Sequence, residues 1–394
     1  MTIKLNYQNL FHYLIDASIC KKKDLEDIKV DVKYSKNLQY TLSLPSLCEL
    51  VVKQEFTLDK YHRGNLIGNE RHIYEFLQSC PDLVYALSLV PEIIHFDESS
   101  SILIYKYPSD YISLASYYEN NIAFPTAIAK LIGNSLAKLH LETMNCQNCS
   151  NFMTQVEEGK IRYHFPYPDH FLDRVEPENL SKFPAEGFWF LVFYQRYENL
   201  RKAVTELVVH QNHCCLSHNN LQFNKILIPK QWETLLSETE YSDESLIKLI
   251  DWEECSWGDP ACDLGTAIAG YLLLWLSSIT VYPDIKFEKS LQLATIPLEV
   301  VHPSIVTITR AYISTYPKVL EDHPDFLKRV IQFAGLGLIY QILARIQSHK
   351  EFNNQGLCML QVAKSLLCQP DKSFISVFGL TELALIDPIL NSVN

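Results

Sequence analysis

The spacing of hydrophobic residues changes along the first part of the chain. Residues 1–26 read as a helix that ends near the basic run Lys21–Lys23. After it, apolar and polar residues alternate with the two-residue period of strands in three runs: Ile28–Tyr34, Gln39–Leu44 and Glu49–Gln54. A turn-like segment, Ser35–Asn37, and Pro45 separate these runs. The pattern predicts an N-terminal helical extension over residues 1–27, followed by a small antiparallel meander.

One helix and two more strands complete the predicted N-terminal part. Within residues 70–77, the apolar side chains of Ile73, Phe76 and Leu77 fall on one helical face. Strand-like runs follow at 93–96 and 102–107, on either side of an acidic turn. Residues 28–106 therefore form a small antiparallel sheet with a helix, and we place its boundary near Lys106.

The remainder, residues 107–394, is predicted to be mainly helical, so the fold class is α+β. Helical spacing covers five segments: Thr126–Glu142, Phe188–His210, 304–320, 324–349 and 356–368. We expect irregular structure in 146–187, an extended turn in Trp232–Glu244, and a tail from Pro370 without a clear period.

One uncharged stretch of 20 residues, Leu264–Pro283, is long enough to span a membrane. It begins directly after Asp263 and contains polar residues and glycines, so we interpret it as a buried core helix. No membrane association is expected.

The composition narrows the function classes. The 394 residues are 47% hydrophobic, which is enough for a large core, and the net charge is −12. Proteins that bind nucleic acids usually carry a basic surface, so we do not expect this acidic chain to bind a nucleic acid. The 11 cysteines are odd in number and scattered, and the N-terminus is too polar for a signal peptide, so we expect a cytoplasmic chain with reduced thiols. Cys146 and Cys149 form a C-x-x-C motif, but no second pair of cysteines has the spacing of a zinc site, so we interpret them as ordinary loop cysteines.

Two polar clusters beside short apolar runs hold the candidate chemistry. The first, CLSHNNLQFNKILI, places His218, Asn220 and Lys225 before the strand-like run 226–228. The second, LIKLIDWEECSWGDPACDLG, places Asp251 at the end of the run 246–250. A short strand that delivers a carboxylate beside a polar loop suits a magnesium–nucleotide site, because Mg²⁺ prefers oxygen ligands and phosphoryl transfer needs positioning and charge neutralisation.

These clusters resemble the motifs of the aminoglycoside phosphotransferase and choline kinase superfamily. Residues 218–227 fit H-[GN]-D-L-x-x-x-N-I-L, except that the family's catalytic Asp falls on Asn220 and its metal-binding Asn falls on Lys225. Residues 250–253 fit I-D-[WF]-E, and residues 258–264 fit G-D-P-A-x-D-L. The segment LIGNSLAKLH resembles the family's L-G-x-x-L-A-x-L-H helix. The resemblance implies a two-lobed protein-kinase-like fold, with a catalytic loop at 216–228 and a metal-binding motif at 250–264.

The resemblance also implies the nucleotide-site residues. Lys53, which closes the run LVVK, would hold the α- and β-phosphates of ATP, and Asp251 would bind Mg²⁺. Glu70 would pair with Lys53, and Glu75 is the alternative. Tyr105 and Tyr107 flank the expected hinge that binds the adenine.

Further residues have supporting roles by the same resemblance. His218 is expected to pack and hydrogen-bond within the loop, Asp263 to brace that loop, and His140 to pack in the core. Glu253 and Glu254 either lie near the acceptor, where they could attract a cationic group, or form a solvated acidic pair.

The two substitutions in the loop leave two functional hypotheses open. Asn220 cannot take a proton, and Asn224 is one position out of register. Lys225 cannot ligate a metal, but as a residue of the cofactor site its ammonium could either stand in for the charge of one metal ion or obstruct that ion. The first hypothesis is a catalytically degenerate kinase. The strings LVVKQE, HNxLxxNxIL and WGDPAxDLG with YLxxWL resemble kinases that act with a HopA-type lyase on Ser or Thr of a precursor peptide, in class V lanthipeptide and thioamitide biosynthesis. The second is an active ATP-dependent phosphotransferase on a small-molecule or peptide hydroxyl.

Overall fold

Contacts between residues divide this computed structural model into two compact units. The N-terminal unit contains residues up to Tyr117 together with Asn224–Cys255, and the C-terminal unit contains Tyr118 to Phe223 and Ser256 onwards. The structure describes these residues: 3–25, 28–34, 37–44, 49–55, 66–144, 146–156, 184–238, 245–280, 289–290 and 293–393.

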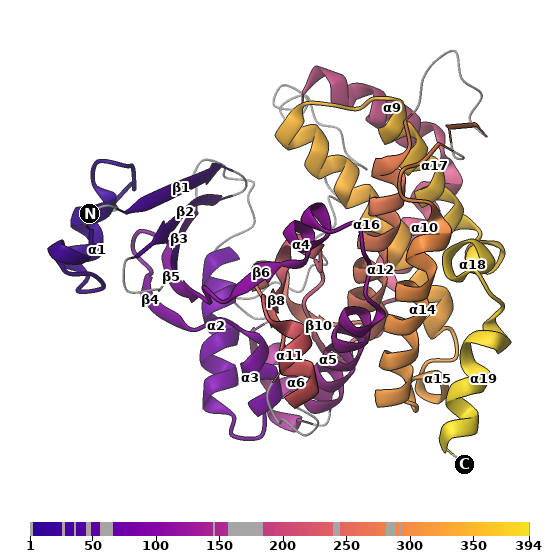
Figure 1. The fold of residues 1–394 in the computed structure, drawn as a ribbon, viewed down its shortest axis with the longest axis horizontal. Coiled ribbons are helices and arrows are strands. Elements are labelled where there is room, and N and C mark those ends of the chain that lie inside the picture. Colours follow the sequence, from indigo (N-terminus) through magenta and orange to yellow (C-terminus); the bar gives the residue numbers. More distant parts are fainter. Residues whose placement is uncertain are drawn as a thin grey trace. The chain divides into compact units, whose positions relative to one another are not determined.

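A five-stranded antiparallel sheet forms most of the N-terminal unit (Figure 1). Its strands are β1 (Lys29–Tyr34), β2 (Asn37–Ser43), β3 (Glu49–Glu55), β4 (Ile93–Asp97) and β5 (Ile102–Tyr107). They lie in the order β1-β2-β3-β5-β4, and Lys53 on the central strand is opposite Gln39 and Leu103. The predicted strands are therefore confirmed. Buried and half-buried side chains alternate along most of β2, because successive side chains of a strand point to opposite faces of the sheet.

Helices of the N-terminal unit cover the sheet. These elements are α1 (Leu10–Asp16), the 3₁₀ turn η1 (Lys22–Leu25), α2 (Leu66–Ser79) and α3 (Val84–Leu89). On one face, Leu10 and Leu14 of α1 join a core cluster with Leu38, Tyr40 and Leu42 of β2. On the other face, Ile67 of α2 joins a cluster with residues of β3 and β5.

The prediction of a helical segment throughout residues 1–27 is wrong in part. Within the described residues 3–25, only α1 and η1 are helical, and Ser18 has a φ of 59°, a left-handed conformation that does not continue a helix. The residues before α1 are held by β3 instead. The Gln54 side chain accepts from Leu5 N at 2.8 Å and donates to Ile3 O at 2.6 Å.

A second sheet of the N-terminal unit contains segments distant in sequence. Its strands are β6 (Tyr111–Ser113), β8 (Ile226–Pro229) and β9 (Lys248–Leu249), in the order β6-β8-β9. This pairing joins 224–255 to the first unit, which extends to Tyr117 rather than to the expected boundary near Lys106. The expected extended turn Trp232–Glu244 begins as a helix, α11 (Trp232–Glu238), and its remainder lies outside the described residues.

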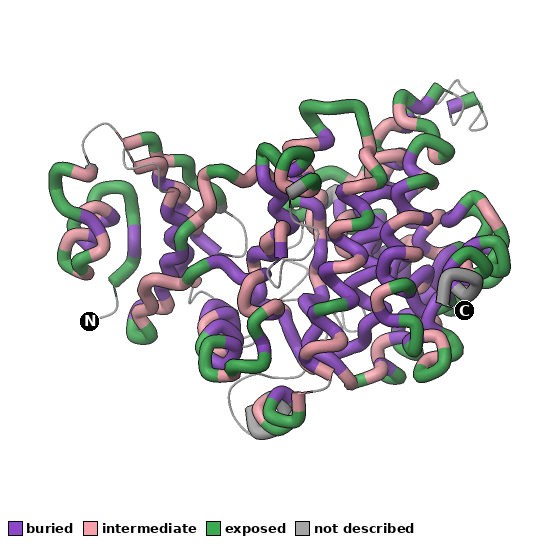
Figure 2. The backbone as a smooth tube through the Cα atoms, turned by 60° about the horizontal axis from the view of Figure 1, so that its bottom comes forward, coloured by how far each residue is buried: buried purple, intermediate pink, exposed green. Residues whose placement is uncertain are grey.

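Helices dominate the C-terminal unit, in which buried residues recur along successive helices (Figure 2). Its elements, including α4, which starts before the boundary, are α4 (Leu114–Asn120), α5 (Thr126–Met144), α6 (Gln147–Val156), η2 (Ala185–Gly187), α9 (Phe188–Arg196), α10 (Glu198–Val209), β7 (Cys215–Ser217), β10 (Ser256–Gly258), α12 (Pro260–Ser278), α14 (Leu298–Thr315), α15 (Val319–Asp322), α16 (Phe326–His349), α17 (Asn354–Cys368), α18 (Pro370–Phe378) and α19 (Glu382–Val393). The 3₁₀ turns η3 (Phe223–Lys225) and η4 (Trp252–Glu254) precede β8 and β10.

Two glycines allow close helix packing in this unit. A Cβ at Gly133 of α5 would lie 2.2 Å from Ile308 O of α14, and a Cβ at Gly265 of α12 would lie 2.6 Å from Phe333 Cβ of α16. By length and composition α12 and α16 could each cross a membrane, but 72% and 67% of their apolar windows are buried inside the structure. The interpretation of Leu264–Pro283 as a core helix is confirmed for α12.

Three helix predictions need correction. The helix expected over Phe188–His210 breaks at Tyr197, whose hydroxyl accepts from Gln361 at 2.7 Å while Lys364 Nζ lies 3.8 Å from its ring centroid. These contacts with α17 hold Tyr197 out of the helical conformation. The region 146–187 was expected to be irregular but includes α6, and the segment after Pro370 forms α18 and α19.

Candidate functional site

Three carboxylates surround the ammonium group of Lys53. Lys53 Nζ lies 2.8 Å from Glu70 Oε2, 2.5 Å from Asp251 Oδ1 and 3.3 Å from Glu253 Oε1. All four residues belong to the N-terminal unit. The side chains of Lys53 and Glu70 are almost fully buried, whereas that of Asp251 is 24% exposed.

The secondary structure explains how Lys53 and Glu70 meet. Lys53 lies two residues after Val51 on β3, so it faces the side of the sheet that packs against α2. Glu70 is on the buried face of α2, while Glu75 is more exposed and accepts from Arg71 Nε at 2.7 Å. The predicted Lys53–Glu70 pair is confirmed, and the alternative Glu75 is excluded as the partner of Lys53.

Burial and charge shift the pKa values of this cluster. Burial opposes the charged ammonium, but Asp251, Glu70 and Glu253 outweigh it and raise the pKa of Lys53 well above its ordinary value. Burial also raises the pKa of Glu70 to about 7, helped by Glu253 and Asp251 and opposed by Lys53. Three acidic groups around one ammonium leave an excess of negative charge, which favours a cation at this position.

A tight turn brings Asp251 and Glu253 to the same lysine. Asp251 follows β9 with a φ of 63° and a ψ of 58°, a left-handed conformation that is uncommon outside glycine. The buried Trp252 fixes the turn by donating from Nε1 to Leu249 O at 2.8 Å. The amide of Ile250 donates to Lys225 O at 3.0 Å, which links this turn to the segment before β8.

Glu253 is a functional residue that the sequence did not define. Its Oε1 accepts from Asn37 Nδ2 at 2.7 Å as well as from Lys53. Asn69 Nδ2 donates to its backbone carbonyl at 3.4 Å. The interpretation of Glu253 as half of a solvated acidic pair is therefore wrong, because its side chain is largely buried among polar groups of β2, β3 and α2.

The donor set fits a divalent cation with a nucleotide. Among the described residues, the buried Oδ1 atoms of Asn37 and Asn69 and the hydroxyl of Tyr105 have no hydrogen-bond partner, so polar groups near Lys53 remain available. The part of the chain that the structure describes contains no group of three His, Cys, Asp or Glu side chains able to hold a metal by itself. Mg²⁺ does not need one, because it commonly takes one or two carboxylates and completes its shell with water and phosphate oxygens.

The two tyrosines proposed for the hinge differ in position. Tyr105 is fully buried, and Lys53 Nζ lies 5.3 Å from its ring centroid. Tyr107 ends β5 and is half-buried, and burial raises its pKa to about 12. Tyr105 is thus a neighbour of the lysine cluster, while the adenine-binding role of either tyrosine stays a prediction.

In the C-terminal unit, Asp263 braces the loop after β7. It accepts from the backbone amides of His218 and Asn219, both at 2.8 Å, and its Oδ2 lies 3.2 Å from His140 Nε2. His140 Nδ1 in turn lies 2.7 Å from the Tyr312 hydroxyl, and both residues are buried. The bracing role of Asp263 and the packing role of His140 are confirmed.

The same loop presents an amide where the family has a carboxylate. Asn220 Oδ1 accepts from Gln222 Nε2 at 3.0 Å, and Asn220 N donates to Nδ1 of the buried His218 at 3.4 Å. Asn220 remains partly exposed, so its carbonyl could orient a hydroxyl group but could not take its proton. Lys225 and the exposed Asn224 belong to the N-terminal unit.

Asp259 has a structural role that was not predicted. Its Oδ1 accepts from Ala261 N at 2.9 Å and caps α12, while its Oδ2 accepts from Arg329 Nε at 2.9 Å and from Asn212 N at 3.0 Å. The Asp-Pro pair at the start of an apolar helix is the local pattern that indicates such a cap.

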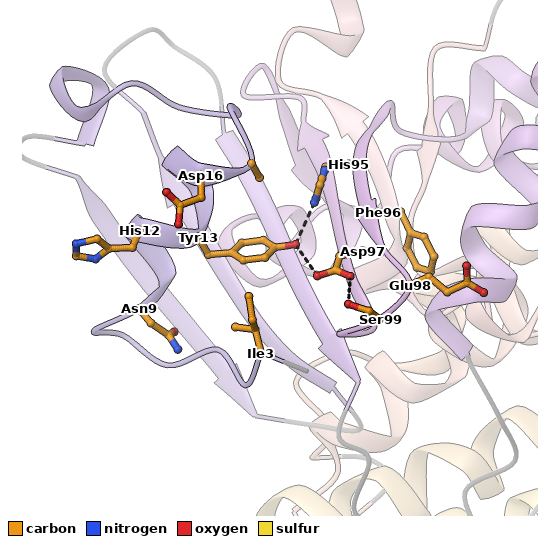
Figure 3. A pocket seen from close by; sticks show the side chains of 11 residues that line it. Ile3, Asn9, His12, Tyr13, Asp16, His95, Phe96, Asp97, Glu98 and Ser99 are labelled. Carbon is orange, nitrogen blue, oxygen red and sulfur yellow. Dashed lines mark hydrogen bonds between the residues drawn. The ribbon is translucent and has the colours of Figure 1, made fainter. Parts of the chain in front are cut away.

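A cavity of about 630 Å³ lies elsewhere in the N-terminal unit, between α1 and the end of β4 (Figure 3). The Tyr13 hydroxyl points into it, 3.0 Å from His95 Nε2 and 3.4 Å from Asp97 Oδ2. None of its lining residues belongs to the lysine cluster. These contacts connect α1 to the edge strand β4, which is a structural role.

Comparison with known proteins identifies the fold. No protein-family model and no curated protein matches the sequence. Among solved structures, an amicoumacin kinase in complex with AMP-PNP, Ca²⁺ and Ami is 14% identical with a TM-score of 0.51, and the match covers 91% of this chain and 93% of that one. An aminoglycoside phosphotransferase in a ternary complex with streptomycin and ATP is 13% identical (TM-score 0.46; 93% and 99% covered), and the choline kinase of Streptococcus pneumoniae is 16% identical (TM-score 0.43; 91% and 98% covered).

At sequence identities this low, the similarity shows the fold and nothing further. The chain combines a small antiparallel sheet with a large set of helices, as the sequence predicted, and it has a protein-kinase-like α+β fold.

Proposed function

We propose that this chain binds a nucleoside triphosphate with Mg²⁺ through its N-terminal unit and transfers the phosphate slowly or not at all. The observation that supports it best is the buried Lys53 ammonium between Glu70 and Asp251. Removing a charged lysine and neighbouring carboxylates from water is unfavourable unless they pair with one another or with a ligand. The cluster therefore differs from an ion pair on the surface, and a ligand is a reason for it to exist.

Each residue of the cluster has a role in this proposal. Lys53 would bind the phosphates, and Glu70 would orient the Lys53 side chain. Asp251 and Glu253 would hold Mg²⁺, which supplies positive charge to the triphosphate when bound. The buried acceptors and hydroxyl of Asn37, Asn69 and Tyr105 would complete a polar wall.

Weak transfer follows from Asn220 and Lys225. An amide at position 220 cannot accept the proton of an attacking hydroxyl, and loss of general-base catalysis costs on the order of 10²–10⁴-fold in rate. The ammonium of Lys225 cannot replace the metal-binding amide oxygen of the family's Asn, because it has no acceptor.

An active phosphotransferase is the second candidate, and the intact loop supports it. Asp263 holds the backbone of residues 218–219 as a catalytic loop requires, and the partly exposed Asn220, whose Oδ1 accepts from Gln222 Nε2, could orient a hydroxyl. Rate would then come from positioning and metal charge, with a proton acceptor other than Asn220.

The acceptor and partner remain part of the proposal. The resemblance favours a precursor peptide and a lyase partner, and the helix α9 offers a surface for a protein partner: Phe188, Trp189 and Val192 are all exposed. Aromatic residues are enriched at such interfaces. Of the aromatic stretch 160–197, only the part from residue 184 lies within the described residues.

A thermal shift experiment tests nucleotide binding. A ligand at 100 times its dissociation constant adds about 2.7 kcal/mol to the free energy of unfolding. We expect Mg·ATP to raise the Tm of the wild type, and Asp251→Asn and Lys53→Ala to abolish the rise. Lys202→Ala is the matched control, because Lys202 pairs with Glu206 on the exposed surface of α10, outside the proposed site, and should keep the full shift. No shift in the wild type at millimolar Mg·ATP would contradict the proposal.

A further inference from the structure

A cysteine and a histidine of the C-terminal unit form a pair outside the site described above. Cys214 Sγ lies 3.8 Å from His323 Nε2. Cys214 directly precedes β7, and its amide donates to Gly258 O at 3.1 Å, which fixes its backbone against β10. His323 follows α15. Cys214 as a residue is partly exposed.

The groups around this pair favour a thiolate opposite an imidazolium. A hydrogen bond from the buried Cys215 thiol is the largest influence, burial opposes it, and contact with His323 assists it, so that the pKa of Cys214 falls to about 6. The pKa of His323 is raised, first by its hydrogen bond with Cys214 and then, against burial, by the charges of Cys214, Asp259 and Asp322.

Cys215, the neighbour of Cys214, stays protonated, and its thiol donates to Gly258 O at 3.7 Å. It is fully buried, and desolvation raises its pKa well above the ordinary value. The two neighbouring cysteines therefore differ. Cys214 is partly exposed and its lowered pKa favours the thiolate, whereas Cys215 is buried and keeps its proton. A thiolate next to a cationic histidine and partly open to solvent is the environment of reactive cysteines.

We propose that Cys214 is a modification site, at which the thiolate reacts with hydrogen peroxide to give a sulfenic acid. The sulfur attacks one peroxide oxygen and forms an S–O bond while the O–O bond breaks. The sulfur is oxidised and the peroxide is reduced. The leaving hydroxide takes the proton of the His323 imidazolium, so that water and neutral His323 are the other products.

Oxidation of Cys214 would affect the start of the segment that leads to the Asn220 loop. Cys214 is separated from His218 by the three residues of β7, and the loop that contains Asn220 continues from that strand. Oxidation removes the charge attraction between Cys214 and His323 at the start of this segment.

The test is a pH profile of alkylation by iodoacetamide, read for each cysteine by fragment-ion mass spectrometry of the full-length protein. Cys358 and Cys368 of α17 are internal controls, because they have intermediate exposure and burial raises the pKa of each. The rate at Cys214 should reach half its plateau near pH 6, while the controls should still rise above pH 8. Thiolate fraction and lower nucleophilicity together predict that Cys214 reacts roughly tenfold faster at pH 6 than an equally accessible thiol of ordinary pKa.

Variants separate the contributions. Cys215→Ala and His323→Gln should each move the half-plateau pH of Cys214 upward, whereas His349→Gln, at the exposed end of α16, should not. After brief exposure to hydrogen peroxide, dimedone should label Cys214 and not Cys358 or Cys368. The proposal is overturned if the wild-type Cys214 profile follows those of the controls, or if dimedone labels the controls and spares Cys214.

Discussion

Lys53 Nζ and Asp251 Oδ1 lie 2.5 Å apart, although the two residues belong to the third strand of the chain and to a turn almost 200 residues later. The same ammonium contacts Glu253 and Glu70. Phosphate oxygens would therefore have to compete with carboxylates for this lysine. In the proposed function, this competition would make nucleotide binding depend on a cation that neutralises Asp251 and Glu253.

The first prediction concerns that dependence. ATP without a divalent cation should give little or no rise in Tm, because three carboxylates repel the triphosphate, and Mg²⁺ should restore the rise. Glu253→Gln removes one negative charge and should strengthen metal-free ATP binding by about tenfold, equivalent to about 1.4 kcal/mol. Titration by isothermal calorimetry in EDTA would measure it, with Glu254→Gln as the control. Equal affinities of wild type and Glu253→Gln would argue against a shared site.

The second prediction is a pH dependence of stability that arises from Glu70. Its pKa is raised from 4.5 to about 7, so the folded state binds this proton more tightly than the unfolded state. The stabilisation that results is complete below pH 4.5 and is lost as the pH rises towards 7. Without divalent cations, the free energy of unfolding of the wild type minus that of Glu70→Gln should fall over this interval, as measured by urea unfolding at several pH values.

Glu75→Gln is the matched control for this experiment, because Glu75 is on the same helix and pairs with Arg71 at the surface. Its unfolding curve should run parallel to that of the wild type. A wild-type advantage over Glu70→Gln that grows from pH 5 to pH 7 would have the wrong sign for a raised pKa.

The third prediction tests the brace of the loop after β7. In Asp263→Asn, one carboxylate oxygen that accepts from the backbone becomes an amide nitrogen, which faces another donor. We expect a loss on the order of 3 kcal/mol in the free energy of unfolding, because the site is buried and the lost bonds are charge-assisted. Asp325→Asn, at an exposed position before α16 without a side-chain cap, should change little. Equal stabilities of the two variants would show that Asp263 does not brace the loop.

Local patterns were sufficient for the parts of the fold that obey a simple period. The alternation in residues 28–54 predicted the meander, because successive side chains of a strand point to opposite faces and the faces of β2 differ in burial. The motif positions of Lys53 and Glu70 predicted their ion pair. The uncharged stretch after Asp263 was correctly assigned to the core because of its place in the motif.

Tertiary contacts explain what the sequence did not show. Glu253 follows a left-handed residue, so no helix or strand period indicates where its side chain points, and its partner Asn37 is 216 positions away. The break at Tyr197 depends on residues of α17, which no local pattern contains. Helix α18 buries residues at helical spacing, Pro370, Phe374 and Val377 among them, but over only nine residues, which is too brief a period to recognise. The buried apolar residues described in α19 are Leu385 and Ile389.

The central proposal, a nucleotide site that is intact and a catalytic loop that is weakened, is tested most directly by the rate of Mg·ATP hydrolysis in the double variant Asn220→Asp with Lys225→Asn. The Asp would supply a proton acceptor and the Asn a metal-binding oxygen. We expect the double variant to turn over at least about 100-fold faster than the wild type, and each single variant to recover less, because residues that act together are not additive. Rapid wild-type turnover, or no gain in a double variant that still binds ATP, would contradict the account.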